Sequence, residues 1–230
     1  MRLYNMVKLE LKILKKNGII LLYIFLTLVY VAVIFFLPYR IINEAAAIII
    51  FSDPVAIGFF MMGAVILMER NQNICDILCV TPLRKYEYVL GKVVSFIILG
   101  MISSLIIALC SGIGHIIAVM AGIFFSSFLY SCIGICVAIK IRSLNQFFLA
   151  SVPVETILSV PAILAVTGAF PINKLLLHPA VSGIYLIYSG GKYSIYSVIV
   201  LLVWCFLTLA ITVKIVHNSF EKNWGSSKIW

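Results

Sequence analysis

Residues 93–139 read VVSFIILGMISSLIIALCSGIGHIIAVMAGIFFSSFLYSCIGICVAI and contain no Lys, Arg, Asp or Glu. A helix needs about 20 apolar residues to cross a bilayer, so this run is too long for one membrane span and suits two. The sequence Gly112-Ile113-Gly114-His115 near its middle is rich in turn residues. The run therefore predicts a hairpin of two membrane-spanning helices.

The composition of the whole chain agrees with this hairpin. It is 63% hydrophobic and 11% charged, with a mean hydropathy of +1.18, which is typical of an integral membrane protein and excludes an ordinary soluble domain. Lipid offers the backbone no hydrogen bonds, so the spans must be helices or closed strands. The chain lacks the alternating apolar and polar pattern of a membrane barrel. We therefore expect an all-α integral membrane protein.

Further apolar runs extend the hairpin to six predicted spans in a single transmembrane domain, residues 1–230. The first run is too long for the core of a signal peptide, and no small-residue cleavage site follows it. The second is interrupted by Asp53-Pro54. The predicted spans are 18–38, 45–68, 93–112, 115–139, 145–168 and 193–213.

Two segments flank these spans. Residues 1–17 predict an amphipathic helix in the membrane interface, although a plain topology signal would also be basic. Residues 169–192, before the last span, are apolar but short and broken by Pro and Gly, which indicates a re-entrant or outer segment, or alternatively an ordinary apolar loop. In the first segment, Leu3, Val7, Leu11 and Leu14 share one predicted face, and Lys8, Lys12, Lys15 and Lys16 share the other.

The basic residues predict the orientation. If the six spans alternate in direction, all of the 17 Lys and Arg residues except Arg40, Lys174 and Lys192 fall on one side. Cytoplasmic loops carry the excess of Lys and Arg, so both termini and residues 69–92 are expected in the cytoplasm, in a multi-pass plasma-membrane protein. This bias and attraction to anionic membrane lipid account for the net charge of +9, and no nucleic acid partner is needed.

The polar interval, residues 69–92, reads ERNQNICDILCVTPLRKYEYVLGK and holds three of the eight acidic residues. Ile74, Ile77 and Leu78 recur at helical spacing and predict a short amphipathic helix. Thr81-Pro82 predicts a break followed by a new helix, because threonine caps a helix and proline is tolerated in its first turn. The polar interval is thus expected to be two helices and a sharp turn at the cytoplasmic surface.

The polar interval resembles the cytoplasmic loop of permeases of ATP-binding-cassette (ABC) exporters of the second type. Those loops read approximately E-R-x-x-G-T-L-E-x-L-L-x-T-P-L-x-x-x-E-x-L-x-G-K, and the chain is most similar to small multidrug or fluoroquinolone-export permeases and lantibiotic-immunity permeases. It departs from the pattern at Asn73-Ile74, where the family has Gly-Thr, and at Asp76, where it has Glu.

The resemblance implies that this loop is a coupling helix, which docks in a groove of a separate cytoplasmic ATPase subunit. It also implies a second permease protomer, and no cofactor on this chain, with ATP and Mg on the ATPase. The alternative is that the matching residues only cap and solvate an intracellular loop. The residues that would shape or present the docking surface are Glu69, Arg70, Asp76, Thr81, Pro82, Glu87, Gly91 and Lys92.

Catalytic motifs are absent from the sequence. The Gly-Lys pairs at 91–92 and 191–192 are followed by Val93 and Tyr193, not by the Ser or Thr of a phosphate-binding loop. Neither H-E-x-x-H nor G-x-S-x-G occurs. Cys75 and Cys79 have no third Cys or His nearby, so no metal site is expected. We expect a transport subunit rather than an enzyme.

Glu155 is the most deeply placed acidic residue in a predicted span. A charged carboxylate at mid-bilayer costs about 2.5–3.5 kcal/mol on insertion scales. Pro153 and Pro161 lie on either side of it, and proline frees backbone carbonyls within a helix. These three residues are candidates for a substrate path. A structural hydrogen bond from Glu155 to a neighbouring span is the alternative.

The sequence therefore favours the permease subunit of an ABC exporter that moves an amphipathic or apolar substrate. The alternative is a membrane immunity or interaction protein that sequesters a toxin without transport. An intramembrane enzyme is disfavoured by the missing motifs.

Overall fold

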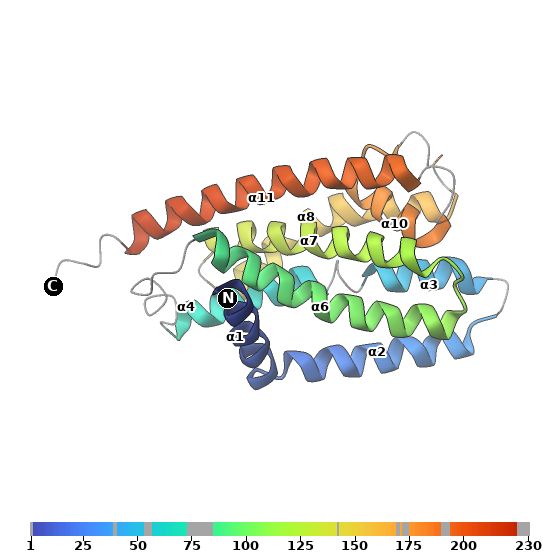
Figure 1. Ribbon diagram of the computed structural model, residues 1–230, viewed down its shortest axis with the longest axis horizontal. Coiled ribbons are helices and arrows are strands. Elements are labelled where there is room, and N and C mark those ends of the chain that lie inside the picture. Colours follow the sequence, from blue (N-terminus) through green and yellow to red (C-terminus); the bar gives the residue numbers. More distant parts are fainter. Residues whose placement is uncertain are drawn as a thin grey trace.

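The computed structural model describes most of the chain, and all regular structure within the described residues is helical (Figure 1). The helices form one elongated bundle, and the first helix and the C-terminal end of the last helix lie toward the same end of it, on the left of Figure 1. The described residues are 2–38, 41–52, 57–72, 85–141, 143–168, 171, 175–189 and 194–224.

Within the described residues, five helices are long and apolar enough to cross a membrane, as expected of a multi-pass membrane protein. They coincide with long apolar runs, in which the polar backbone must be satisfied by helical hydrogen bonds. Helix α6 begins in the polar interval and continues through the predicted third span. The five are α2 (Ile19–Phe36), α6 (Lys85–Ser111), α7 (Ile116–Lys140), α8 (Leu144–Val166) and α11 (Ser194–Trp224).

The predicted second span, residues 45–68, falls on two shorter helices. These are α3 (Ile42–Ser52) and α4 (Phe59–Asn71), which lie toward opposite ends of the bundle (Figure 1). Asp53-Pro54, the interruption seen in the sequence, lies outside the described residues.

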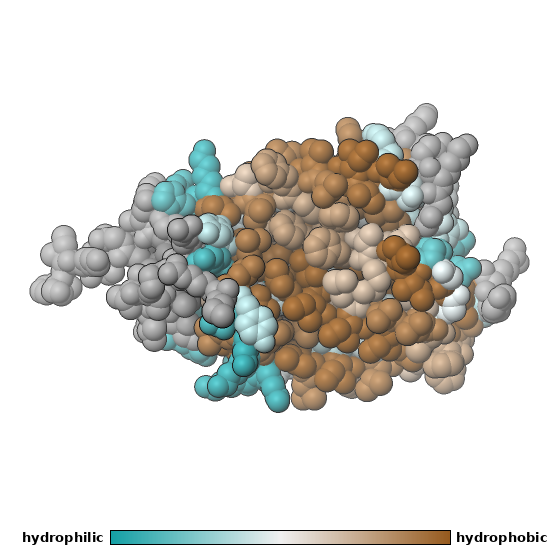
Figure 2. All heavy atoms as spheres, in the orientation of Figure 1, coloured by the Kyte–Doolittle hydropathy of each residue, from teal (hydrophilic) through white to brown (hydrophobic). Residues whose placement is uncertain are grey.

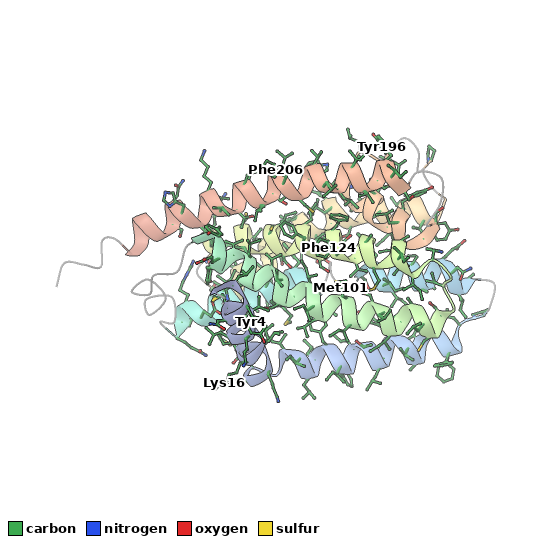
Figure 3. All side chains as sticks on the ribbon, viewed as in Figure 1. Tyr4, Lys16, Met101, Phe124, Tyr196 and Phe206 are labelled. Atoms are coloured by element: carbon green, nitrogen blue, oxygen red, sulfur yellow. The ribbon has the colours of Figure 1, made fainter. Side chains whose placement is uncertain are left out.

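The surface of the bundle has the polarity that a bilayer requires. Apolar side chains form a broad central band, and hydrophilic residues gather at the two ends (Figure 2). Tyr196 and Phe206 point outward from α11 (Figure 3), and Phe206 is 74% exposed. Such exposure of large apolar side chains is costly in water but not in lipid.

Helix α7 forms the centre of the bundle and packs against α3, α4, α6, α8, α10 and α11. Small residues permit this close packing. A Cβ atom on Gly134 would lie 2.9 Å from the backbone oxygen of Phe59 in α4, and one on Gly122 would lie 3.0 Å from the backbone oxygen of Gly183 in α10.

The segment before α11 contains the short helix α10 (Pro179–Ser189), which packs against α3, α7, α8 and α11. Residues 179–187 are buried. His115 Nε2 lies 2.9 Å from the backbone oxygen of Ile187 and holds the hairpin turn between α6 and α7 against α10. Much of the segment predicted as re-entrant or outer is thus part of the protein interior.

The N-terminal helix α1 (Arg2–Lys16) crosses the other helices at the end of the bundle that carries both termini (Figure 1). Gly18 follows it with φ 76°, a left-handed conformation that lets the chain turn sharply into α2. The predicted apolar face is only partly correct. The structure buries Met6, Glu10 and Leu14, whereas Leu3 is 40% exposed.

Candidate functional site

Three charged side chains of α1, α4 and α6 meet inside the protein, at the end of the bundle where α1 lies. Lys92 Nζ of α6 lies 2.5 Å from Glu69 Oε1 of α4 and 3.1 Å from Glu10 Oε1 of α1. The exposed fractions of Lys92, Glu69 and Glu10 are 0%, 1% and 2%. We call Glu10, Glu69 and Lys92 the charge cluster.

Tyr88, one helical turn before Lys92 on α6, completes the surroundings of the charge cluster. Its hydroxyl donates a hydrogen bond of 3.1 Å to Glu69 Oε2. Lys92 Nζ also lies 5.0 Å from the centre of the Tyr88 ring, within the range of a cation–π contact. The ammonium group therefore has partners on several sides, as a buried charge requires.

The charge cluster contains two carboxylates for one ammonium group, so it is one negative charge in excess when both acids are ionised. Burial raises the pKa of the Glu10 carboxyl; the nearby Lys92 lowers it and Glu69 raises it further. Glu10 Oε1 also lacks a hydrogen-bond donor of good geometry. A proton on Glu10 would neutralise the charge cluster.

Glycine at position 91 lets α1 approach α6 closely enough to form the charge cluster. A Cβ atom there would lie 2.5 Å from Cγ and 3.3 Å from Cβ of Met6. Since Met6 and Glu10 are one turn apart on α1, a side chain at Gly91 would push Glu10 away from Lys92.

Arg70 joins the same end of α4 to α7. Its guanidinium donates hydrogen bonds of 2.8 Å to the backbone oxygen of Ile141 and 3.2 Å to that of Ile139. These carbonyls lie at the C-terminus of α7, where helix oxygens have no intrahelical donors and a positive charge is favourable. Arg70 thus caps α7 from a neighbouring helix.

The candidate docking residues fall into three groups. Glu69, Gly91 and Lys92 are interior residues that hold α1, α4 and α6 together, and Glu87 is only 9% exposed. Arg70 contacts α7. Asp76, Thr81 and Pro82 lie outside the described residues.

Sequence reasoning missed Glu10, which lies in the charge cluster beside Lys92. The signal was present, because Glu10 is the only acidic residue in the first helix and is spaced four residues from both Met6 and Leu14. An acid aligned with apolar residues on one helical face indicates a buried charge with a partner.

Glu155 lies away from the charge cluster, as the central residue of α8, and is half-buried. Pro153 and Pro161 are both inside this helix. Each lacks the N–H that would bond to the carbonyl four residues earlier, so the oxygens of Leu149 and Ile157 are left without their helical donors.

Metal ligands do not gather in the part of the chain that the structure describes, since no group of three or more His, Cys, Asp or Glu is found there. Cys75 and Cys79 lie outside it.

Comparison of the sequence with known proteins shows which family it resembles. The chain matches the fluoroquinolones export permease protein family over residues 1–223. It is also 26% identical over 180 residues to the fluoroquinolones export permease proteins of two Mycobacterium tuberculosis strains, CDC 1551 / Oshkosh and ATCC 25618 / H37Rv. Each alignment covers 77% of this chain and 76% of the relative. Together with the apolar bundle, the match over nearly the whole length shows that the chain belongs to the fluoroquinolones export permease protein family.

Proposed function

We propose that this chain is the membrane subunit of an exporter driven by a separate ABC-type ATPase. The observation that carries the proposal is the position of the charge cluster. Glu69 near the end of α4 and Lys92 in the N-terminal part of α6 are the first and last residues of the polar interval, and their ion pair joins these two helices. A segment anchored at both ends in this way is suited to receive force from a docked partner.

In the proposed topology the chain crosses the plasma membrane six times, with α3 and α4 together making the second crossing. In this topology both termini and the polar interval face the cytoplasm, because α1 with its four lysines lies at the same end of the bundle as α4 and the C-terminal end of α11 (Figure 1). α1 lies in the cytoplasmic interface beside anionic lipid, with Lys16 at its α2 end (Figure 3).

In the proposed mechanism, ATP and Mg bind to the ATPase, and its closure pushes on the polar interval. The charge cluster carries the displacement to α1, α4 and α6, while Arg70 carries it to α7. A second protomer completes the path through the membrane. The cargo is amphipathic or apolar, and fluoroquinolones, named in the description of both relatives, are the first compounds to test.

The test is co-purification followed by reconstitution. The purified permease should hydrolyse no ATP alone and should co-purify with an ATPase, and vesicles holding both should transport a fluoroquinolone only with ATP. Asp76→Lys and Glu87→Lys should weaken the association, whereas Glu44→Lys, a change of an exposed acid in the first turn of α3, should not. An undiminished complex in both interval variants would refute the docking assignment.

The alternative, a membrane protein that sequesters a toxin without transport, predicts a different outcome. It requires ligand binding that is independent of ATP and no accumulation against a gradient. The same vesicles, assayed with and without ATP, distinguish the two functions.

A further inference from the structure

One side of α8 combines apolar and polar residues in a defined order. Phe148, Val152, Glu155 and Ser159 are separated by four, three and four residues, so they share one face of the helix. Along this face two apolar side chains are followed by a carboxylate and then by a hydroxyl. We call these four residues the α8 stripe.

The apolar end of the α8 stripe lines a groove between α2, α4 and α8. The groove has a volume of about 430 Å³, which falls within the range of small-molecule sites. Phe148 stacks near Phe60 of α4 at its wall, with ring centroids 5.8 Å apart. The residues that line the groove are Leu22, Leu26, Ile57, Phe60, Met61, Phe148 and Val152.

The polar end of the α8 stripe reaches α7. Ser159 is 9% exposed and Tyr130 of α7 is 1% exposed, yet neither hydroxyl makes a hydrogen bond of good geometry. The Tyr130 hydroxyl faces that of Ser159, and the charge of Glu155 acts on the Tyr130 hydroxyl. Buried hydroxyls in this state are unusual, because leaving a polar group unpaired in an apolar interior costs free energy.

Glu155 also lacks a compensating charge, since no ion pair to it is found within the described residues. Ionisable groups within membrane spans normally face a partner. A ligand with a positive charge and hydrogen-bond donors would pair with the carboxylate and the two hydroxyl oxygens at once. Its apolar part would then lie in the groove one turn away.

We propose that Glu155, Tyr130 and Ser159 bind the protonated amine of an amphipathic cargo, whose aromatic or alkyl part occupies the groove between α2, α4 and α8. The inference rests on the proposed export function and narrows the cargo to amphipathic amines. Tyr130 and Ser159 accept hydrogen bonds from the ammonium group, and Glu155 neutralises it. Such charge-assisted bonds are stronger than neutral ones.

The test uses two fluorescent probes that differ only in charge. Dansylcadaverine has an aromatic fluorophore on an alkyl chain that ends in a protonated amine, and its N-acetyl derivative is neutral. Binding is measured by fluorescence with the full-length permease and its co-purified ATPase, in nanodiscs of zwitterionic lipid, so that neither probe is attracted by lipid charge. Glu155→Gln keeps the shape of the side chain, and Glu44→Gln is the matched control on an exposed acid.

The wild-type and Glu44→Gln proteins should bind the amine more tightly than the acetylated probe. Glu155→Gln should reduce that preference by about tenfold or more, with binding of the neutral probe unchanged. Tyr130→Phe should reduce the preference for the amine by a smaller factor. This variant tests the proposal if Glu155→Gln does not fold. Equal affinity of the wild type for both probes, or a preference retained in Glu155→Gln and Tyr130→Phe, would overturn the proposal.

Failure of this inference differs from failure of the export function. If the permease binds amines selectively but vesicles transport neither probe with ATP, the export function is refuted and the cation site stands. If both probes are exported equally well by the wild type and by Glu155→Gln, export stands and the cation site is refuted.

Discussion

Lys92 Nζ lies 2.5 Å from Glu69 Oε1, and both side chains are withdrawn from the surface, although they are the last and first residues of the polar interval. In an apolar bundle, two charges in this position depend on each other. Desolvating each is costly, and only the partner compensates for the cost.

Lys92→Met should therefore destabilise the protein strongly, by about 3–5 kcal/mol, because it leaves two buried carboxylates without their cation. Unfolding by denaturant in mixed micelles measures the loss. The matched control, Lys8→Met, changes an exposed lysine of α1 and should have little effect. The triple variant Glu10→Gln, Glu69→Gln, Lys92→Met should recover much of the stability, and a triple variant as unstable as Lys92→Met would contradict this account.

Glu10 should make stability depend on pH. Burial raises the pKa of its carboxyl above the ordinary value of 4.5, so the folded protein binds this proton more tightly than the unfolded chain. The stabilisation that protonated Glu10 gives the folded protein is complete below pH 4.5. It is lost as the pH rises through the pKa that the Glu10 carboxyl has in the folded protein. The thermal midpoint of the wild type should fall across that window. Glu10→Gln should flatten this part of the profile, and an identical slope in both proteins would exclude Glu10 as its source.

Gly134→Ala should destabilise the bundle by about 1–3 kcal/mol, because the new methyl group would lie 2.9 Å from the backbone oxygen of Phe59, which cannot rotate away. Gly114→Ala is the control, since a Cβ atom there meets nothing within 4 Å. Thermal unfolding of the two variants measures the difference. Comparable midpoints would mean that α4 and α7 are not packed as closely as described.

Arg70→Lys should separate ATP hydrolysis from transport. Lysine keeps the charge but lacks the forked guanidinium that donates to both Ile139 and Ile141. The ATPase should still bind, while the amount of cargo moved per ATP falls, as measured in vesicles. The control is Lys214→Gln on an exposed position of α11. If the ratio is unchanged in Arg70→Lys, the contact with α7 has no part in coupling.

The sequence predicted the long helices well where apolar runs are continuous. The turn at 112–115 separates α6 from α7, and Gly112 adopts φ 73°. The boundaries were less predictable where a helix continues beyond its apolar part. α11 runs on to Trp224, past the predicted end at 213, because a helix can continue into water once its apolar part has left the membrane.

The charge cluster was only half predictable. The motif drew attention to Glu69 and Lys92 as residues of one loop, and a loop residue is normally expected at the surface. Their burial depends on α1 folding back across α6, a long-range contact between positions 10 and 92 that no local pattern contains. Likewise, no sequence pattern reveals that the buried hydroxyls of Tyr130 and Ser159 face each other without a hydrogen bond of good geometry.

The unequal packing of the helices has a mechanical consequence. α7 is held on several sides by its neighbours, whereas α2 makes its main contacts with α1, α3 and α6 and has a largely exposed apolar surface. A transporter that changes conformation needs helices that stay in place and helices that move. In the proposed exporter, α7 would stay in place, and α2, a wall of the groove, is the helix that could move with the least disruption of packing.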